Sequence, residues 1–291
     1  MTAVIIEDQA LKGLEGNVVI VTGGSSGIGL ATVSLALELG AKVVMGDRNS
    51  PPPELTHEAF TFVPINVTSW AELSSLFEKA LELHGRIDHV FANAGVGPRM
   101  TLLEDKVDSN GKLLEPDFHV LDINLKSVMN TTALGLHYMK KQESGGSIVL
   151  TASASRMHSR PSFDAVDYTT AKHGVLGLMR SLVPRLQSKL PVRINAIAPA
   201  WVNTGIISGE RIRQMGHLYM EPPDVARSAL TLMADGTRNG QLIYSQATAD
   251  GGVEYKEIDS GLIAAALALC SGPLGHLSLD TGPVSEKAVT E

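Results

Sequence analysis

The chain has 291 residues, of which 44% are hydrophobic and 19% charged, and its formal net charge is −7. This composition is typical of a soluble globular protein, and an acidic chain without a basic run argues against a nucleic-acid surface. The longest apolar run, residues 261–270, is too short to span a bilayer, and the N-terminus lacks the basic start of a signal peptide. A single cysteine, Cys270, excludes an internal disulfide and fits a reducing compartment. We therefore expect a cytoplasmic protein with no membrane or nucleic-acid partner.

Short β-rich runs alternate along the chain with longer runs of helical periodicity. Strands are predicted at residues 17–23, 41–47, 60–67, 86–95, 147–153, 192–199 and 241–252. Helices are predicted at residues 28–40, 69–85, 118–141, 165–189 and 222–234, and Ser69 followed by Glu72 predicts a capping box. Strands separated by crossover helices indicate an α/β fold with a parallel sheet covered on both faces. We expect one domain over residues 1–254 and a C-terminal extension over residues 255–291.

A glycine-rich turn, TGGSSGIG, occupies residues 22–29 between the first predicted strand and helix. Its glycines allow the backbone to approach a ligand, and the start of the helix offers free N–H groups to a phosphate. Asp47 ends the second strand, where an acid accepts hydrogen bonds from an adenosine ribose and repels a 2′-phosphate. This favours NAD over NADP, although Arg48 beside it is a residue that meets a 2′-phosphate in other sites.

The same turn contains GGSSG over residues 23–27, which also matches the G-x-S-x-G elbow of serine hydrolases. Such an elbow needs an earlier loop to supply an oxyanion-hole N–H, and only about twenty residues precede Ser25. The hydrolase interpretation is therefore disfavoured.

Tyr168 and Lys172 are four residues apart in a predicted helix and so share one face. A neighbouring ammonium favours the phenolate and lowers the pKa of a tyrosine. A surface helix with an incidental tyrosine and lysine is the alternative that this pair alone leaves open.

Taken in order, TGGSSGIG, NAG at residues 93–95, Asn124, Ser153 and Tyr168-x-x-x-Lys172 resemble the short-chain dehydrogenase/reductase family. The resemblance extends over about residues 14–252. It implies a single-domain, doubly wound Rossmann fold with a seven-stranded parallel sheet. It also implies an oxidoreductase that interconverts a small-molecule secondary alcohol and ketone with NAD or, less favoured here, NADP.

The resemblance assigns roles to individual residues. The implied cofactor contacts are Gly23, Ser25, Ser26, Gly27, Ile28, Gly29, Asp47, Arg48, Asn66, Val67, Asn93, Ala94, Gly95, Tyr168, Lys172, Pro199, Val202 and Thr204. In the implied catalytic set, Asn124 braces the site, Ser153 binds the substrate oxygen, Tyr168 is the general acid/base and Lys172 assists it. The family also implies a homodimer or homotetramer and a substrate-covering segment at residues 205–221. No metal site is expected, since the histidines lack ligand spacing.

Three positions depart from the family pattern. Ala200 follows Pro199 where a glycine is usual, and Asn66 stands where an aspartate often meets the adenine. Counting back from Tyr168 selects Ser155 as the catalytic serine, whereas strand register selects Ser153, which we prefer. Two other functions stay open: non-redox chemistry such as cyclisation or elimination, and a silent NAD-binding regulator.

Overall fold

In the computed structural model of the chain, residues 2–154, 165–187 and 189–259 are described. Ser155 and most of the expected C-terminal extension lie outside these residues. None of the helices in the described ranges combines the length and the apolar character needed to cross a membrane.

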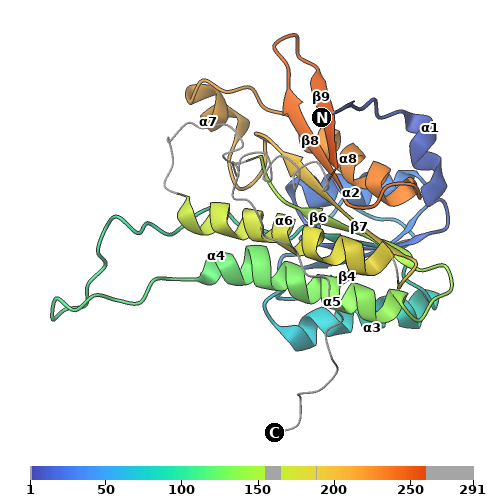
Figure 1. The fold of residues 1–291 in the computed structure, drawn as a ribbon, viewed down its shortest axis with the longest axis horizontal. Coiled ribbons are helices and arrows are strands. Elements are labelled where there is room, and N and C mark those ends of the chain that lie inside the picture. Colours follow the sequence, from blue (N-terminus) through green and yellow to red (C-terminus); the bar gives the residue numbers. More distant parts are fainter. Residues whose placement is uncertain (1, 155–164, 188, 260–291) are drawn as a thin grey trace, which may run out of the picture. The chain divides into compact units, whose positions relative to one another are not determined.

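Within the described residues, the sheet has nine strands in the order β1-β9-β8-β7-β6-β5-β2-β3-β4 (Figure 1). The strands are β1 Thr2–Ala3, β2 Val18–Thr22, β3 Lys42–Asp47, β4 Phe60–Pro64, β5 His89–Ala92, β6 Gly146–Thr151, β7 Val192–Pro199, β8 Gln241–Ala247 and β9 Val253–Asp259. Strands β2 to β8 are mutually parallel, which confirms the predicted α/β class and its parallel sheet.

The predicted strand count of seven is too low, because β9 and β1 extend the sheet beyond β8. β9 pairs antiparallel with β8 from Val253 to Asp259, and Thr2 and Ala3 of β1 then pair with β9. The sheet thus continues past residue 254, where we expected the domain to end. Ile258 is the one buried residue of β9, so this strand lacks the apolar run by which the other strands were found.

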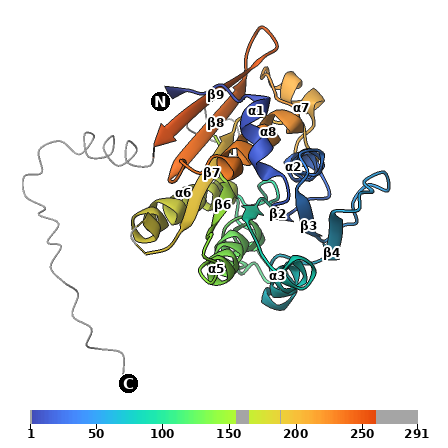
Figure 2. The same ribbon diagram turned by 90° about the vertical axis from the view of Figure 1, so that its right-hand side faces the viewer.

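Helices cover both faces of the sheet, as Figure 2 shows. They are α1 Asp8–Leu11, α2 Gly27–Glu38, α3 Trp70–His84, α4 His119–Leu121, α5 Ser127–Met139, α6 Val166–Gln187, α7 Gly209–Gln214 and α8 Pro222–Ala234, with a 3-10 turn at Lys12–Leu14 and a π turn at Asp122–Lys126. α2 and α8 pack on one face, whereas α3, α5 and α6 lie on the other. The core beneath α2 and α8 is built from strand residues such as Val19, Phe91 and Ile197.

Helix α3 illustrates how local sequence determines an element. Its buried residues Leu73, Leu76, Phe77 and Ala80 recur at helical spacing, and Gly85 ends it in the left-handed region at φ +71°. The Ser69 hydroxyl accepts the Glu72 N–H at 3.4 Å, as predicted.

The reciprocal half of the predicted capping box at α3 is wrong. The Glu72 carboxylate accepts from the N–H of Asn66 at 2.7 Å, whereas the Ser69 N–H donates to the Asn66 carbonyl. The loop after β4 offers a closer N–H donor than the cap residue itself.

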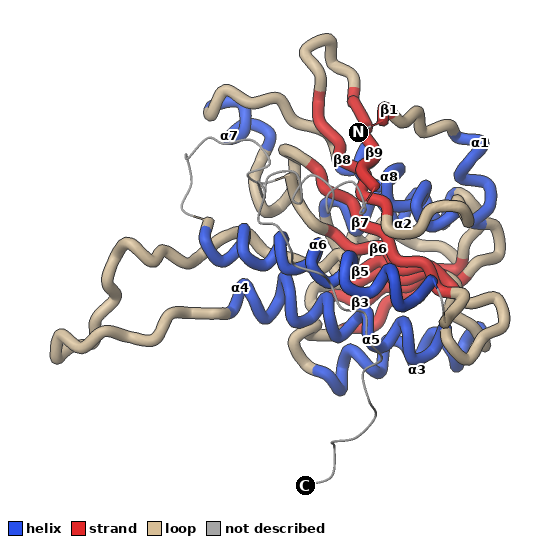
Figure 3. The backbone as a smooth tube through the Cα atoms, in the orientation of Figure 1, coloured by secondary structure: helices blue, strands red, loops and turns tan. Residues whose placement is uncertain are grey.

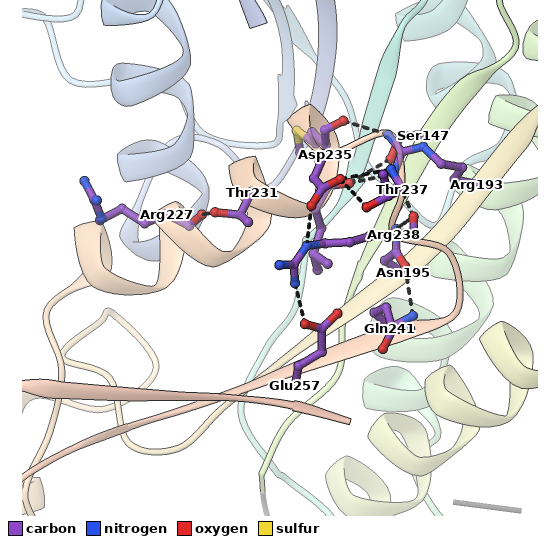
Figure 4. Close-up of polar contacts among 12 residues, drawn as sticks. Ser147, Arg193, Asn195, Arg227, Thr231, Asp235, Thr237, Arg238, Gln241 and Glu257 are labelled. Carbon is purple, nitrogen blue, oxygen red and sulfur yellow. Dashed lines mark hydrogen bonds and ion pairs between the residues drawn. The ribbon is translucent and has the colours of Figure 1, made fainter. Parts of the chain in front are cut away.

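The C-terminal end of α8 is attached to the amino ends of the central strands (Figure 4). The Arg193 guanidinium of β7 donates to the carbonyls of Leu232 at 3.0 Å, Met233 at 2.7 Å and Arg238 at 2.8 Å. A cation at this position satisfies the free carbonyls at the helix end and interacts favourably with the helix dipole. These hydrogen bonds hold the end of α8 against the amino end of β7.

A long loop between β5 and α4 projects from the body of the fold (Figure 3). Its outer part is a small hairpin in which Val107 bridges Leu113. Its inner part, residues 96–100, stays at the carboxyl end of β5 and borders the site described next.

Candidate active site

The predicted site residues gather at the carboxyl edge of the parallel strands. The chain runs from β2 outward through β3 to β4, and then crosses to β5 on the other side of β2. Strand order reverses between β2 and β5, and ligands of open α/β sheets bind at such a switch point. Thr22, Asp47, Ala92 and Thr151 end four of these strands and thus lie along one end of the sheet.

The glycine turn between β2 and α2 leaves no room for side chains. A Cβ on Gly29 would lie 2.0 Å from the carbonyl oxygen of Gly23, and a Cβ on Gly23 would lie 2.7 Å from the Cα of Ala94. Gly23 and Gly27 also have positive φ, at +72° and +53°. Ser26 is the N-cap of α2, so the N–H groups of Gly27, Ile28 and Gly29 begin the helix and point out of it.

Asp47 is joined to the glycine turn by hydrogen bonds. Its carboxylate accepts from the N–H of Ser25 at 3.0 Å and from the N–H of Asn49 at 2.9 Å, and the Ser25 hydroxyl donates to the Asn49 carbonyl at 2.6 Å. Each carboxylate oxygen has two lone pairs, so both can accept a further bond. Arg48 is exposed beside it.

Asn66 and Val67, which were predicted to meet the cofactor, follow β4. The Asn66 side chain accepts from the N–H of Thr68 at 3.1 Å and from its hydroxyl at 2.9 Å, which forms an Asx turn. This carbonyl oxygen is thus already used locally, which leaves the amide NH₂ of Asn66 for a ligand.

Asn93 joins the ends of three strands. Its amide donates to the carbonyls of Thr22 at 3.2 Å and Gly23 at 3.1 Å, and its carbonyl oxygen accepts from the Thr151 hydroxyl at 3.3 Å. The Thr22 hydroxyl in turn accepts from the N–H groups of Asn93 and Ala94. Thr22 and Thr151 were not among the predicted site residues, although their positions at strand ends beside the motifs are visible in the sequence.

Asn124 lies in a π turn, so the helix predicted over residues 118–141 is interrupted. The turn covers Asp122–Lys126 and separates α4 from α5. The fully buried Asn124 side chain accepts from the N–H of Val96 and donates to the carbonyl of Val96, both at 2.8 Å. Such bulges occur frequently at functional sites. Here the π turn carries Asn124, whose side chain holds Val96 at the inner end of loop 96–100.

Ser153, Tyr168 and Lys172 meet between the end of β6 and the first turns of α6. The side chains of Ser153 and Tyr168 are hydrogen-bonded to each other. The Lys172 ammonium donates to the carbonyl of Thr151 at 2.7 Å and lies 5.8 Å from the centre of the Tyr168 ring. A Cβ on Gly95 would lie 3.6 Å from the Lys172 nitrogen, so the NAG segment borders this group.

The pKa values in this cluster differ from the sequence-based expectation. Burial raises the pKa of Tyr168 above its ordinary value, and the hydrogen bond from Ser153 opposes this only in part. Burial sets the direction of this shift, so the pKa of Tyr168 is not lowered as the sequence predicted. Burial instead lowers the pKa of Lys172 itself to about 8.

Residues 199–207 follow the end of β7 and reach the glycine turn. A Cβ on Gly27 would lie 3.2 Å from the Thr204 methyl group, so Thr204 stands over the start of α2. Val202 is buried and bridges Met220, whereas Pro199 ends β7. Ala200, which stands where the family usually has glycine, donates its backbone N–H to the Ser245 carbonyl at 2.9 Å.

The described part of the chain contains no group of three His, Cys, Asp or Glu side chains arranged to hold a metal ion. One further acid that the motifs did not point to, Asp167, is almost fully buried directly before Tyr168.

The model of the short chain dehydrogenase family matches residues 17–214. The short-chain dehydrogenase/reductase ascJ of Acremonium egyptiacum is 46% identical over 270 residues, which cover 91% of this chain and 88% of that protein. The human 15-hydroxyprostaglandin dehydrogenase [NAD(+)] is 30% identical over 274 residues, covering 85% of this chain and 96% of the relative.

A solved structure shares the fold. The 3-ketoacyl-(acyl-carrier-protein) reductase from Brucella melitensis, complexed with NADH, superposes with a TM-score of 0.68 at 23% identity, over 79% of this chain and 97% of that one. The family match covers strands β2 to β7, the glycine turn and the Tyr/Lys helix described above. The chain therefore belongs to the short-chain dehydrogenase/reductase family of Rossmann-fold oxidoreductases.

Proposed function

We propose that the protein is an NAD-dependent dehydrogenase that interconverts a secondary alcohol and a ketone on a mid-sized apolar metabolite, in the direction of alcohol oxidation. The observation that carries this proposal is the Ser153–Tyr168 hydrogen bond beside the buried Lys172, at the same end of the sheet as the glycine turn. Such a reaction requires a proton-transfer group and a binding site for the dinucleotide, and both are expected at one switch point of the sheet.

The residues present fit a nicotinamide dinucleotide. A Cβ on Gly23 or Gly29 would collide with Ala94 or with the Gly23 carbonyl, so these glycines let the turn fold tightly at the start of α2. We assign the pyrophosphate to the N–H groups that begin α2. The Asp47 carboxylate favours a ribose with free hydroxyls over a 2′-phosphate, and the NAD(+) in the name of the human relative supports the same preference.

In this proposal, Tyr168 moves the proton. When bound, the nicotinamide accepts or supplies the hydride. The Tyr168 phenolate takes the hydroxyl proton of an alcohol, and Ser153 hydrogen-bonds the same substrate oxygen and orients it. Because the pKa of Lys172 is about 8, its side chain carries a positive charge at neutral pH and stabilises the phenolate nearby. Asn124 keeps Val96 in place at the substrate side of the site.

The rim of the crevice supports an apolar substrate. Ile206 and Leu218 of the proposed covering segment are 51% and 54% exposed, which makes them available to cover a ligand. Trp201, which precedes this segment, stacks on His217 within it, with ring centres 5.3 Å apart. The hydroxyprostaglandin in the name of the human relative is likewise a mid-sized, largely apolar alcohol.

We also propose a cytoplasmic homodimer or homotetramer that associates through α5 and α6.

Cofactor titration tests the proposal. We expect wild type to bind NAD⁺ more tightly than NADP⁺, and Asp47→Ala to reduce this preference because the carboxylate that repels the 2′-phosphate is gone. Asp105→Ala, which removes an exposed acid on the projecting loop, is the matched control. Equal or tighter binding of NADP⁺ by wild type would overturn the cofactor assignment.

Turnover of secondary alcohols separates the oxidoreductase from the alternatives. Tyr168→Phe removes the proton-transfer group and is expected to lower kcat by about 10²-fold or more. Unchanged turnover in that variant contradicts the mechanism. Turnover without any nicotinamide cofactor would favour non-redox chemistry, and NAD⁺ binding without turnover of any substrate would favour a regulator.

A further inference from the structure

Asp167 is a buried acid whose hydrogen bonds join two parts of the site. It is 1% exposed and stands in the first turn of α6, directly before Tyr168. One carboxylate oxygen accepts from the N–H of its neighbour Tyr168 at 2.7 Å. The other accepts from the N–H groups of Arg99 at 3.0 Å and Met100 at 2.9 Å, which belong to the loop after β5.

An ordinary helix cap does not account for these contacts. An acid in the first turn normally serves only the free N–H groups of its own helix, as Tyr168 N–H is served here. The two bonds to Arg99 and Met100 instead reach residues 68 and 67 positions away. In the described part of the chain the partners of this carboxylate are backbone amides, and a buried carboxylate without a cation is costly unless such donors compensate it.

The loop that Asp167 holds borders the substrate side of the crevice. Its inner end is fixed at Val96 by Asn124, and its outer end is fixed at Arg99 and Met100 by Asp167. Between these points, a Cβ on Gly97 would lie 3.1 Å from the side chain of Ile206 in the covering segment. Loop 96–100 thus contacts both the first turn of α6, which carries Tyr168, and the proposed substrate-covering segment.

We propose that Asp167 is a positioning residue that ties loop 96–100 to the turn carrying Tyr168, and so sets where a substrate carbinol lies relative to the phenol. Its consequence for catalysis rests on the proposed function. Displacements of about 1 Å in such a geometry lower catalytic efficiency by about 10²-fold, although the residue never touches the substrate.

The test compares Asp167→Ala and Asp167→Asn with wild type. Asp167→Ala removes all three acceptor contacts. Asp167→Asn keeps one carbonyl oxygen, which can still accept from Arg99 and Met100, but places an NH₂ group opposite the Tyr168 N–H. Asp224→Asn is the matched control, because Asp224 is a first-turn acid of α8 that accepts the N–H of Glu221 within its own cap.

Amide hydrogen exchange reports on the contacts without any need for activity. In Asp167→Ala we expect the amides of Arg99 and Met100 to exchange about 10²-fold faster than in wild type, whereas Asp167→Asn retains most of their protection. Asp224→Asn should leave both rates unchanged. Unchanged exchange of the two amides in Asp167→Ala would overturn the proposal.

Kinetics then distinguish positioning from a general loss of structure. With cyclohexanol, menthol and testosterone as probes, kcat/KM of Asp167→Ala should fall about 10²-fold and that of Asp167→Asn about 10-fold, while the Kd for NADH stays within about twofold. A parallel loss of NADH binding and kcat/KM would overturn the positioning role. If Asp167→Ala does not fold, Asp167→Asn carries both measurements. A wild type that binds no NADH would overturn the proposed function, and the exchange rates would still decide the role of Asp167.

Discussion

Replacing Lys172 by methionine is expected to make the protein more stable and inactive. The ammonium is 4% exposed, and burial lowers its pKa from 10.5 to about 8. Because burial lowers this pKa, holding the charge in the fold costs about 3 kcal/mol below pH 8. Methionine has a similar length and carries no charge, so the variant avoids this cost.

The gain is reduced by the hydrogen bond that is lost. The Lys172 ammonium donates to the Thr151 carbonyl at 2.7 Å, and a bond of this kind contributes about 1 kcal/mol or somewhat more. We therefore expect Lys172→Met to raise the free energy of unfolding by about 2 kcal/mol at pH 7. Its turnover should be lost, since the positive charge beside Tyr168 is gone.

The pH dependence has a defined sign. Between pH 8 and 10.5 the unfolded chain binds more protons at this lysine than the folded chain does, so the stability of wild type rises with pH in that window. Lys172→Met lacks this rise, and its advantage over wild type should disappear by about pH 10.5.

Urea denaturation at several pH values between 7 and 10, followed by fluorescence, measures both curves. Lys140→Met is the control, because Lys140 is exposed at the end of α5 and its replacement relieves no burial. The reasoning is refuted if Lys172→Met is less stable than wild type at pH 7, or if the difference between the two proteins does not change with pH.

Two further predictions concern the glycine turn and the opposite edge of the sheet. Gly29→Ala places a Cβ 2.0 Å from the Gly23 carbonyl oxygen and should abolish NADH binding measured by fluorescence, whereas Gly177→Ala, where a Cβ meets nothing within 4 Å, should not; retained binding in Gly29→Ala would contradict the cradle. Burial lowers the pKa of His89 from 6.5 to about 4, so unfolding takes up a proton between these values, and stability should fall by about 3 kcal/mol as pH decreases from 6.5 to 4. His89→Gln does not titrate and should lack this component in acid denaturation; identical pH curves for the two proteins would show that the histidine is not held neutral.

The sequence by itself determined the fold class and the family. Alternating apolar runs and helical periodicity are local properties, so the strands β2 to β8 and their crossover helices could be predicted from neighbouring residues. The glycine turn could be predicted too, because closely spaced glycines between a strand and a helix indicate a tight turn. In the structure, a Cβ at Gly23 or Gly29 would collide with neighbouring backbone. The order of the motifs then identified the family.

Tertiary structure alone decided how these residues act on one another. The Asn124 side chain in the π turn is hydrogen-bonded to Val96, 28 residues away. Asp167 accepts from amides that lie 67 and 68 residues away. Sequence periodicity carries no signal over such separations. β9 and β1 join the sheet by backbone pairing with a strand edge, which needs no apolar pattern of their own. The pKa values of Tyr168 and Lys172 follow from burial, a property that their four-residue spacing does not contain.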